Sequence, residues 1–134
     1  MRLGRLALVL LACGLLACAP QRLLLKPPAG APPLTVEYPE SLAEDARFVK
    51  ETLKDVWPKL GVFGPLSVPS TIALHPEQAT IETLAGLPNS AWLHAWATYD
   101  RIDLLTPSRW TGPCRREHLA ALLLHELTHL AMYQ

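Results

Sequence analysis

Cysteine, net charge and long apolar runs are all scarce in this sequence. The 134 residues include three cysteines, and 12 basic residues balance 12 acidic ones. Because the chain has no excess of positive charge, it lacks the electrostatic signature of a nucleic-acid-binding protein, and we expect no nucleic-acid partner. The length and composition indicate one small domain.

The apolar run at the N-terminus is too short to span a membrane. It covers Leu6–Ala17, which is 12 residues, and follows Arg2 and Arg5. A spanning helix needs about 20 residues. A charged start followed by a short apolar stretch is typical of a signal peptide, so we assign residues 1–17 to processing rather than to the fold.

The residues Leu15-Leu16-Ala17-Cys18 resemble a bacterial lipobox, in which the cysteine is acylated and becomes the mature N-terminus. The resemblance implies a lipid anchor at Cys18 and a bacterial cell-envelope protein, with the following alanine favouring the outer membrane. An overlapping match at Cys13 leaves a very short apolar segment. The alternatives are an ordinary secretory signal, giving a secreted or periplasmic protein, and an uncleaved anchor.

Processing changes both the charge and the cysteine count. Loss of Arg2 and Arg5 leaves 10 basic residues against 12 acidic ones, a net charge of −2. If Cys18 carries lipid, Cys114 has no partner for a disulfide within the chain, and no disulfide stabilises the fold. We interpret Cys114 as a structural or incidental thiol.

Residues 18–33 hold five prolines and one glycine, and we interpret them, with the lipidated cysteine, as a linker. Leu23–Leu25 is a small apolar exception, which could pack either on the domain or on lipid headgroups. The ordered domain is expected to cover residues 34–134.

Periodicity predicts an α+β domain, with a small, mostly antiparallel sheet of three or four strands packed on helices. Ser41 and Glu44 form a capping-box pattern at the start of a helix that Pro58 and Gly61 should end. A short helix is expected from Pro76 to Gly86. The expected strands cover 34–38, 70–75, 92–99 and 102–105, and the last helix covers 116–133.

The motif His125-Glu126-Leu127-Thr128-His129 lies in that last helical pattern, which contains neither glycine nor proline. A spacing of four residues places both histidines on one face of a helix, where they can reach one metal ion. Neutral imidazole suits Zn²⁺. Glu126 stands about 100° round the helix from His125. That offset suits a general base acting on water.

Chance and a structural role are the alternatives to a metal site. Random placement of five histidines and eight glutamates gives this motif in roughly 1% of such chains, so chance is a poor explanation. A structural histidine pair needs internal partners for two imidazoles and a carboxylate, because unpaired buried polar groups are costly.

The motif resembles that of zincin metallopeptidases, and its Glu-Leu-Thr-His core looks most like the gluzincin, peptidase MA-like members. The resemblance implies Zn²⁺ bound by His125 and His129, Glu126 as the catalytic base, and a peptide or protein substrate. In such enzymes an edge strand beside the active-site helix pairs with extended substrate. By position, that strand is 96–99 or 102–105.

The family's third zinc ligand has no match in this sequence. A metzincin has a glycine three residues after the second histidine, where this chain has Met132, and a gluzincin takes a glutamate from a following helix. Three explanations stand: a truncated peptidase, a ligand from a partner, or a degenerate relative. His118 lies about 10.5 Å from His125 along the helix axis, too far to share one ion. The other candidates, which need tertiary folding to approach, are Glu82, His94 and Asp103.

Two functions follow from the sequence. The first is a zinc-dependent metallopeptidase anchored at the cell envelope, in which metal-activated water hydrolyses peptide bonds. The alternative is a noncatalytic envelope lipoprotein or metal-binding module with a degenerate zincin fold.

Overall fold

The computed structural model describes residues 19–25, 29–62, 64–113 and 115–134. The expected signal peptide, the lipidation site Cys18 and the thiol Cys114 lie outside these residues. Within them, no helix combines the length and apolarity needed to cross a membrane.

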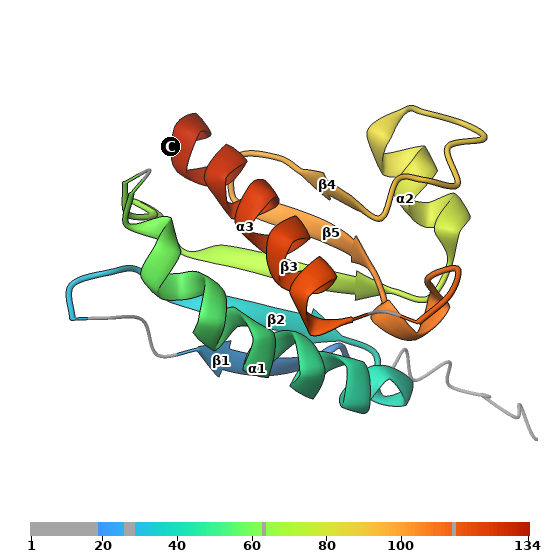
Figure 1. Ribbon diagram of the computed structural model, residues 1–134, viewed down its shortest axis with the longest axis horizontal. Helices are drawn as coiled ribbons and strands as arrows, with labels where there is room; N and C mark the ends of the chain where they lie inside the picture. Colours follow the sequence, from blue (N-terminus) through green and yellow to red (C-terminus); the bar gives the residue numbers. More distant parts are fainter. Residues whose placement is uncertain (1–18, 26–28, 63, 114) are drawn as a thin grey trace, which may run out of the picture.

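A five-stranded mixed sheet forms one layer of the domain (Figure 1). The strand order is β1-β2-β3-β5-β4. Strands β2, β3 and β5 run parallel, whereas β1 and β4 pair antiparallel at the two edges. The strands are β1 (Gln21–Leu25), β2 (Leu34–Tyr38), β3 (Ser70–His75), β4 (Ala95–Ala97) and β5 (Arg101–Leu105).

The α+β class is as predicted, but the sheet is larger and less antiparallel than expected. The connection from β2 to β3 contains a long helix, which returns the chain so that β3 starts in the same direction as β2. Strand β4 comes between β3 and β5 in the sequence, but in the sheet it pairs with the outer side of β5. Strands β3 and β5 are therefore direct neighbours, and they run parallel. Local periodicity predicts strands without fixing these pairings.

Strand β1 lies inside the segment expected to be a linker. It pairs with β2 along its whole length. Leu23 and Leu25 pack against the core, because alternate residues of a strand face the same side of the sheet. The sheet therefore begins at Gln21 rather than at Leu34, and two of the three leucines, Leu23 and Leu25, pack on the domain.

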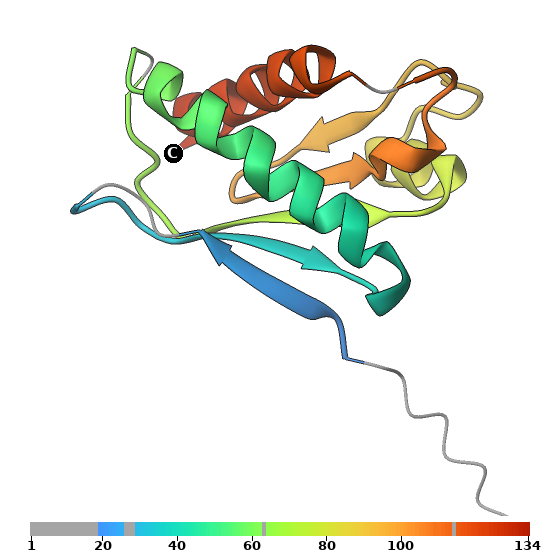
Figure 2. The same ribbon diagram turned by 60° about the horizontal axis from the view of Figure 1, so that its bottom comes forward.

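Two long helices lie side by side across one face of the sheet (Figures 1 and 2). They are α1 (Ala43–Leu60) and α3 (Arg116–Tyr133). The predicted α1 stripe of Ala46, Val49, Leu53 and Val56 is fully or almost fully buried. Burial of these apolar side chains against the sheet supplies the main stabilisation of this layer.

The remaining helices are short. They are α2 (Gln78–Ala85), η1 (Glu40–Leu42) and η2 (Pro107–Arg109), the last two being 3₁₀ turns. Helix α2 packs separately against β4 and β5, where Ile81 meets Leu93 and Leu105. It ends at Gly86 as predicted, with a left-handed φ of 68° that suits glycine.

The predicted start of α1 is wrong, whereas its predicted end at Gly61 is confirmed. The chain enters α1 through η1, and no side chain caps the first turn of either helix, so the Ser41–Glu44 capping box does not form. Pro58 lies inside the last turn instead of ending the helix. A proline there removes one hydrogen bond near a helix end that already frays, so the helix continues to Leu60.

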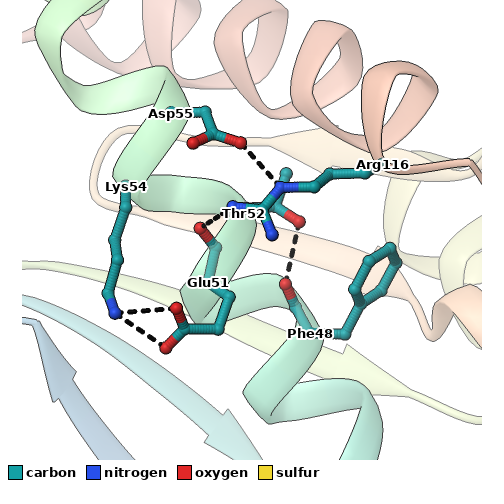
Figure 3. A network of polar contacts seen from close by, with 6 residues as sticks. All are labelled: Phe48, Glu51, Thr52, Lys54, Asp55 and Arg116. Atoms are coloured by element: carbon teal, nitrogen blue, oxygen red, sulfur yellow. Dashed lines mark hydrogen bonds and ion pairs between the residues drawn. The ribbon is translucent and has the colours of Figure 1, made fainter.

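Helix α3 is fastened to α1 at its first residue (Figure 3). Arg116 Nε donates to Asp55 Oδ2 at 2.6 Å, and Arg116 Nη2 donates to the Glu51 carbonyl at 2.8 Å. The hydrogen bond from Arg116 lowers the pKa of Asp55. Because one guanidinium contacts both a side chain and the backbone of α1, it fixes where α3 begins.

The other end of α3 is held by the side-chain amide of Gln134. Its Oε1 accepts hydrogen bonds from the backbone N–H groups of Ser67 and Val68, at 2.7 and 3.2 Å. Its Nε2 donates to Ser70 Oγ and to the Tyr99 carbonyl, at 3.0 and 3.1 Å. These contacts join α3 to the start of β3 and to the β4–β5 turn.

Candidate metal centre

Both histidines of the sequence motif lie on α3, and their rings converge. His125 Nε2 and His129 Nε2 are 3.1 Å apart, and the ring planes meet at 86°. The opposite side of the helix carries fully buried leucines, which fix its rotation about its own axis. Those leucines are Leu119, Leu123, Leu127 and Leu130.

The separation of the two Nε2 atoms fits a tetrahedral zinc ion. Two imidazole nitrogens at Zn–N distances of about 2.05 Å and a tetrahedral angle lie about 3.3 Å apart. The observed 3.1 Å is close to that value. It is also a hydrogen-bond distance, which one neutral ring donating to the other would satisfy. The pair therefore suits either two corners of a zinc site or a structural contact.

Glu126 is the most buried acidic side chain of α3, with the residue 7% exposed. Burial raises its pKa because it disfavours the charged carboxylate, and His125 and His129 oppose part of that rise. Among the described residues, no group donates a hydrogen bond to this carboxylate. A largely buried carboxylate whose pKa is raised is typical of a group kept for chemistry rather than for stability.

The three side chains open into a hollow of about 310 Å³ between α3, β4 and the loop before β4. Strand β4 forms the edge of the sheet on this side (Figure 1). Of the two strands that the family resemblance left open, β4 is therefore the edge strand. The hollow is lined by Leu87, Trp92, Leu93, Ala95, Trp96, Ala97, His125, Glu126, His129 and Tyr133.

Among the described residues, no further side chain suited to metal binding joins the histidine pair. In the part of the chain that the structure describes, no group of three or more His, Cys, Asp or Glu side chains is placed to hold a metal ion. Glu82 accepts a hydrogen bond from the Asn89 N–H, and His94 stacks on Trp110. His118 lies exposed in the first turn of α3. The described residues thus bring together the His125–His129 pair and the Glu126 carboxylate, without a third candidate ligand.

Asp103, another candidate ligand, belongs to a polar cluster that the sequence analysis missed. Its Oδ1 lies 2.7 Å from His75 Nε2 and 3.0 Å from Arg101 Nε. Burial alone raises the pKa of Asp103, but hydrogen bonds from His75 and Arg101 bring it below its ordinary value. Its neighbours Ile102 and Leu104 face the core, so this cluster faces away from α1 and α3.

The signal for this cluster is only partly present in the sequence. Arg101 and Asp103 alternate, so they share a face of any strand that holds them. The contribution of His75 depends on the register of β3 with β5, in which Ala73 lies opposite Asp103. One sequence does not reveal that register.

A larger hollow of about 590 Å³ lies at the C-terminal end of α1, between Trp57 and Leu66. Its described lining contains no titratable side chain. The described side chains around this hollow therefore offer no group for acid–base chemistry or metal binding. The candidate site remains the hollow beside α3.

Comparison with known proteins gives no relative: no family model, no curated protein sequence and no solved structure matches this chain.

Proposed function

We propose that the chain is a zinc-dependent metallopeptidase domain. The observation that carries the proposal is the 3.1 Å separation of His125 Nε2 and His129 Nε2, beside the buried carboxylate of Glu126 in one hollow. Two convergent imidazoles with an adjacent base are the parts that metal-assisted hydrolysis needs on a single helix.

Zn²⁺ at the two histidines would supply Lewis acidity, which lowers the pKa of water and polarises a carbonyl. Glu126 then accepts a proton from water and passes it to the leaving amine. The raised pKa of Glu126 suits both steps, because a base that must also release its proton works best with a pKa near the working pH.

An extended peptide is the substrate that this edge of the sheet can hold. The Leu105 N–H donates to the His94 carbonyl, and the Thr98 N–H donates to the Arg101 carbonyl, each at 2.8 Å. Since backbone groups alternate between the two sides of a strand, those of Ala95 and Ala97 point away from β5. A peptide strand that pairs with them passes beside the histidines.

We assign the third zinc ligand to polypeptide outside the described residues, either a further segment or a partner. The resemblance of residues 15–18 to a lipobox supports a location at the cell envelope, with lipid on Cys18 as the membrane anchor. The absence of a third ligand from the described residues favours the alternative, a noncatalytic envelope lipoprotein or metal-binding module.

The test compares the chain with its Glu126→Gln variant, each supplied with the polypeptide that carries the third ligand and then loaded with zinc. We expect about one zinc per chain in both proteins, measured by atomic absorption, and peptide hydrolysis in the wild type alone. Hydrolysis that persists in Glu126→Gln excludes the base assignment. Zinc binding without hydrolysis in the wild type supports the metal-binding module.

A further inference from the structure

Most of the side chains that line the hollow beside the histidine pair are apolar, although metal-assisted hydrolysis does not itself need apolar side chains. Apart from His125, Glu126 and His129, its lining is aliphatic or aromatic. Three of these lining side chains are exposed to solvent: Leu87 at 39%, Trp92 at 71% and Tyr133 at 54%. Large apolar side chains left open around a polar centre are typical of a binding surface.

We propose that this hollow selects peptides with a large, uncharged apolar side chain next to the bond to be cleaved, and that Trp92 is the main specificity residue. The inference rests on the proposed peptidase function and adds a substrate class to it. The occupant is a side chain of the extended peptide that pairs with β4.

Strand β4 provides the space for that side chain. Ala95 and Ala97 face the helix side of the sheet, where each places only a methyl group beside α3. Trp96 faces the other side, against Ile81 and Leu105. Alternate side chains of a paired peptide follow the same two faces, so one of them lies over the alanines and the histidines.

Charge in the hollow determines which side chain is accepted. The described lining holds no lysine or arginine, and its one carboxylate is the base Glu126. An acidic side chain would find no lysine or arginine there to pair with and would lie beside the carboxylate of Glu126. A lysine side chain would compete for the carboxylate that must act on water. An apolar side chain instead gains contact with the indole of Trp92.

The experiment measures both binding and cleavage of blocked pentapeptides, Ac-Gly-Gly-X-Gly-Gly-NH₂, with X as Phe, Leu, Asp or Lys. Binding is followed by amide shifts of Ala95 and Ala97 in the zinc-free wild-type protein, which keeps Glu126 but lacks the metal needed to hydrolyse the probe. Cleavage is followed with the zinc-loaded wild type, with the polypeptide that carries the third ligand present. We expect the Phe and Leu peptides to bind and react about tenfold better than the Asp peptide, the discrimination that an apolar pocket commonly achieves.

Trp92→Arg should reverse the preference toward the Asp peptide, and Trp92→Ala should reduce the preference for Phe. The matched control is Leu24→Arg, which makes an equivalent change at an exposed position, 57% accessible, on the opposite edge strand β1. This control should leave the order of the peptides unchanged.

The outcomes separate the two proposals. Cleavage with no preference among the four peptides, or the same reversal in Leu24→Arg, overturns the specificity inference and leaves the peptidase standing. A binding preference for Phe and Leu without any cleavage supports the hollow as an apolar peptide site and contradicts the peptidase.

Discussion

The Gln134 side chain and the backbone N–H of Ser67 are 67 residues apart in sequence and joined by a hydrogen bond of 2.7 Å. Through this contact the residue that follows α3 is held against the loop that leads into β3. Together with Arg116 at the first turn, it fixes both ends of the helix that carries His125 and His129.

Gln134→Ala should destabilise the domain by about 1 kcal/mol, because it leaves the partly buried Val68 N–H and the Ser70 hydroxyl without the Gln134 amide. Urea denaturation followed by circular dichroism measures the loss. The control is Met132→Ala in the same turn, which is 74% exposed and should change stability by less than about 0.5 kcal/mol. Equal effects of the two variants would show that the amide contacts contribute nothing.

His125→Ala and His129→Ala should each abolish the rise in melting temperature that zinc gives. A ligand that binds only the folded state at 100 times its Kd stabilises that state by about 2.7 kcal/mol, and loss of one of two imidazoles removes most of the affinity. Thermal melts with and without zinc measure the effect. His118→Ala, on the same helix but outside the pair, should keep the full zinc response. A zinc response retained in both pair variants would contradict the metal site.

Glu126→Gln should stabilise the zinc-free protein at neutral pH. Burial raises the pKa of Glu126, so keeping its carboxylate charged in the folded state costs free energy that a neutral amide does not cost. The free energy of unfolding, compared with that of the exposed control Glu117→Gln, measures the gain. A loss of stability specific to Glu126→Gln would indicate that the carboxylate has a structural partner.

Asp103→Asn should make stability less dependent on pH in the acid range. The pKa of Asp103 is lower in the folded state than its ordinary 3.8, so the unfolded chain binds its proton first as the pH falls. The stabilisation from Asp103 is therefore complete above about pH 4 to 5 and is lost as the pH falls through the folded-state pKa.

Unfolding curves between pH 2 and 7 test this behaviour, with Asp100→Asn as the control in the adjoining turn. We expect the difference between wild type and Asp103→Asn to shrink at low pH, while the difference for Asp100→Asn stays small throughout. If the difference in unfolding free energy between wild type and Asp103→Asn grew as the pH fell, the folded-state pKa of Asp103 would be raised rather than lowered, which would contradict this prediction.

Cys18→Ala should prevent lipid labelling of the chain in a bacterial host, whereas Cys13→Ala should not. Acylation at the lipobox cysteine is the basis of this expectation, and metabolic incorporation of labelled palmitate measures it. Labelling that is lost in Cys13→Ala and retained in Cys18→Ala would move the anchor to the overlapping motif.

The sequence predicts those features of the fold that depend on local periodicity. The strand 70–75, the stripe of α1 from Ala46 to Val56 and the end of α2 at Gly86 all appear where expected. Each depends on side chains within one turn or one strand, and such patterns are readable in a single chain.

Features that depend on distant pairing were not predicted. The partners of Gln134 and the placement of His75 beside Asp103 both require the register of strands that are far apart in sequence. Strand β1 was missed for the same reason, since three leucines between prolines become a strand only because β2 offers an edge. At the candidate site, the spacing of His125 and His129 was predictable, but the surrounding hollow was not, because β4 and its preceding loop form it.

Because β1 starts soon after Cys18, a lipid on that residue would keep the domain close to the membrane. If Cys18 carries lipid, only Ala19 and Pro20 separate the modified residue from the first strand. Three residues of extended chain span about 10 Å. The edge of the sheet would then stay within one domain width of the bilayer, so proteins at the membrane surface would be accessible to the hollow and distant ones would not.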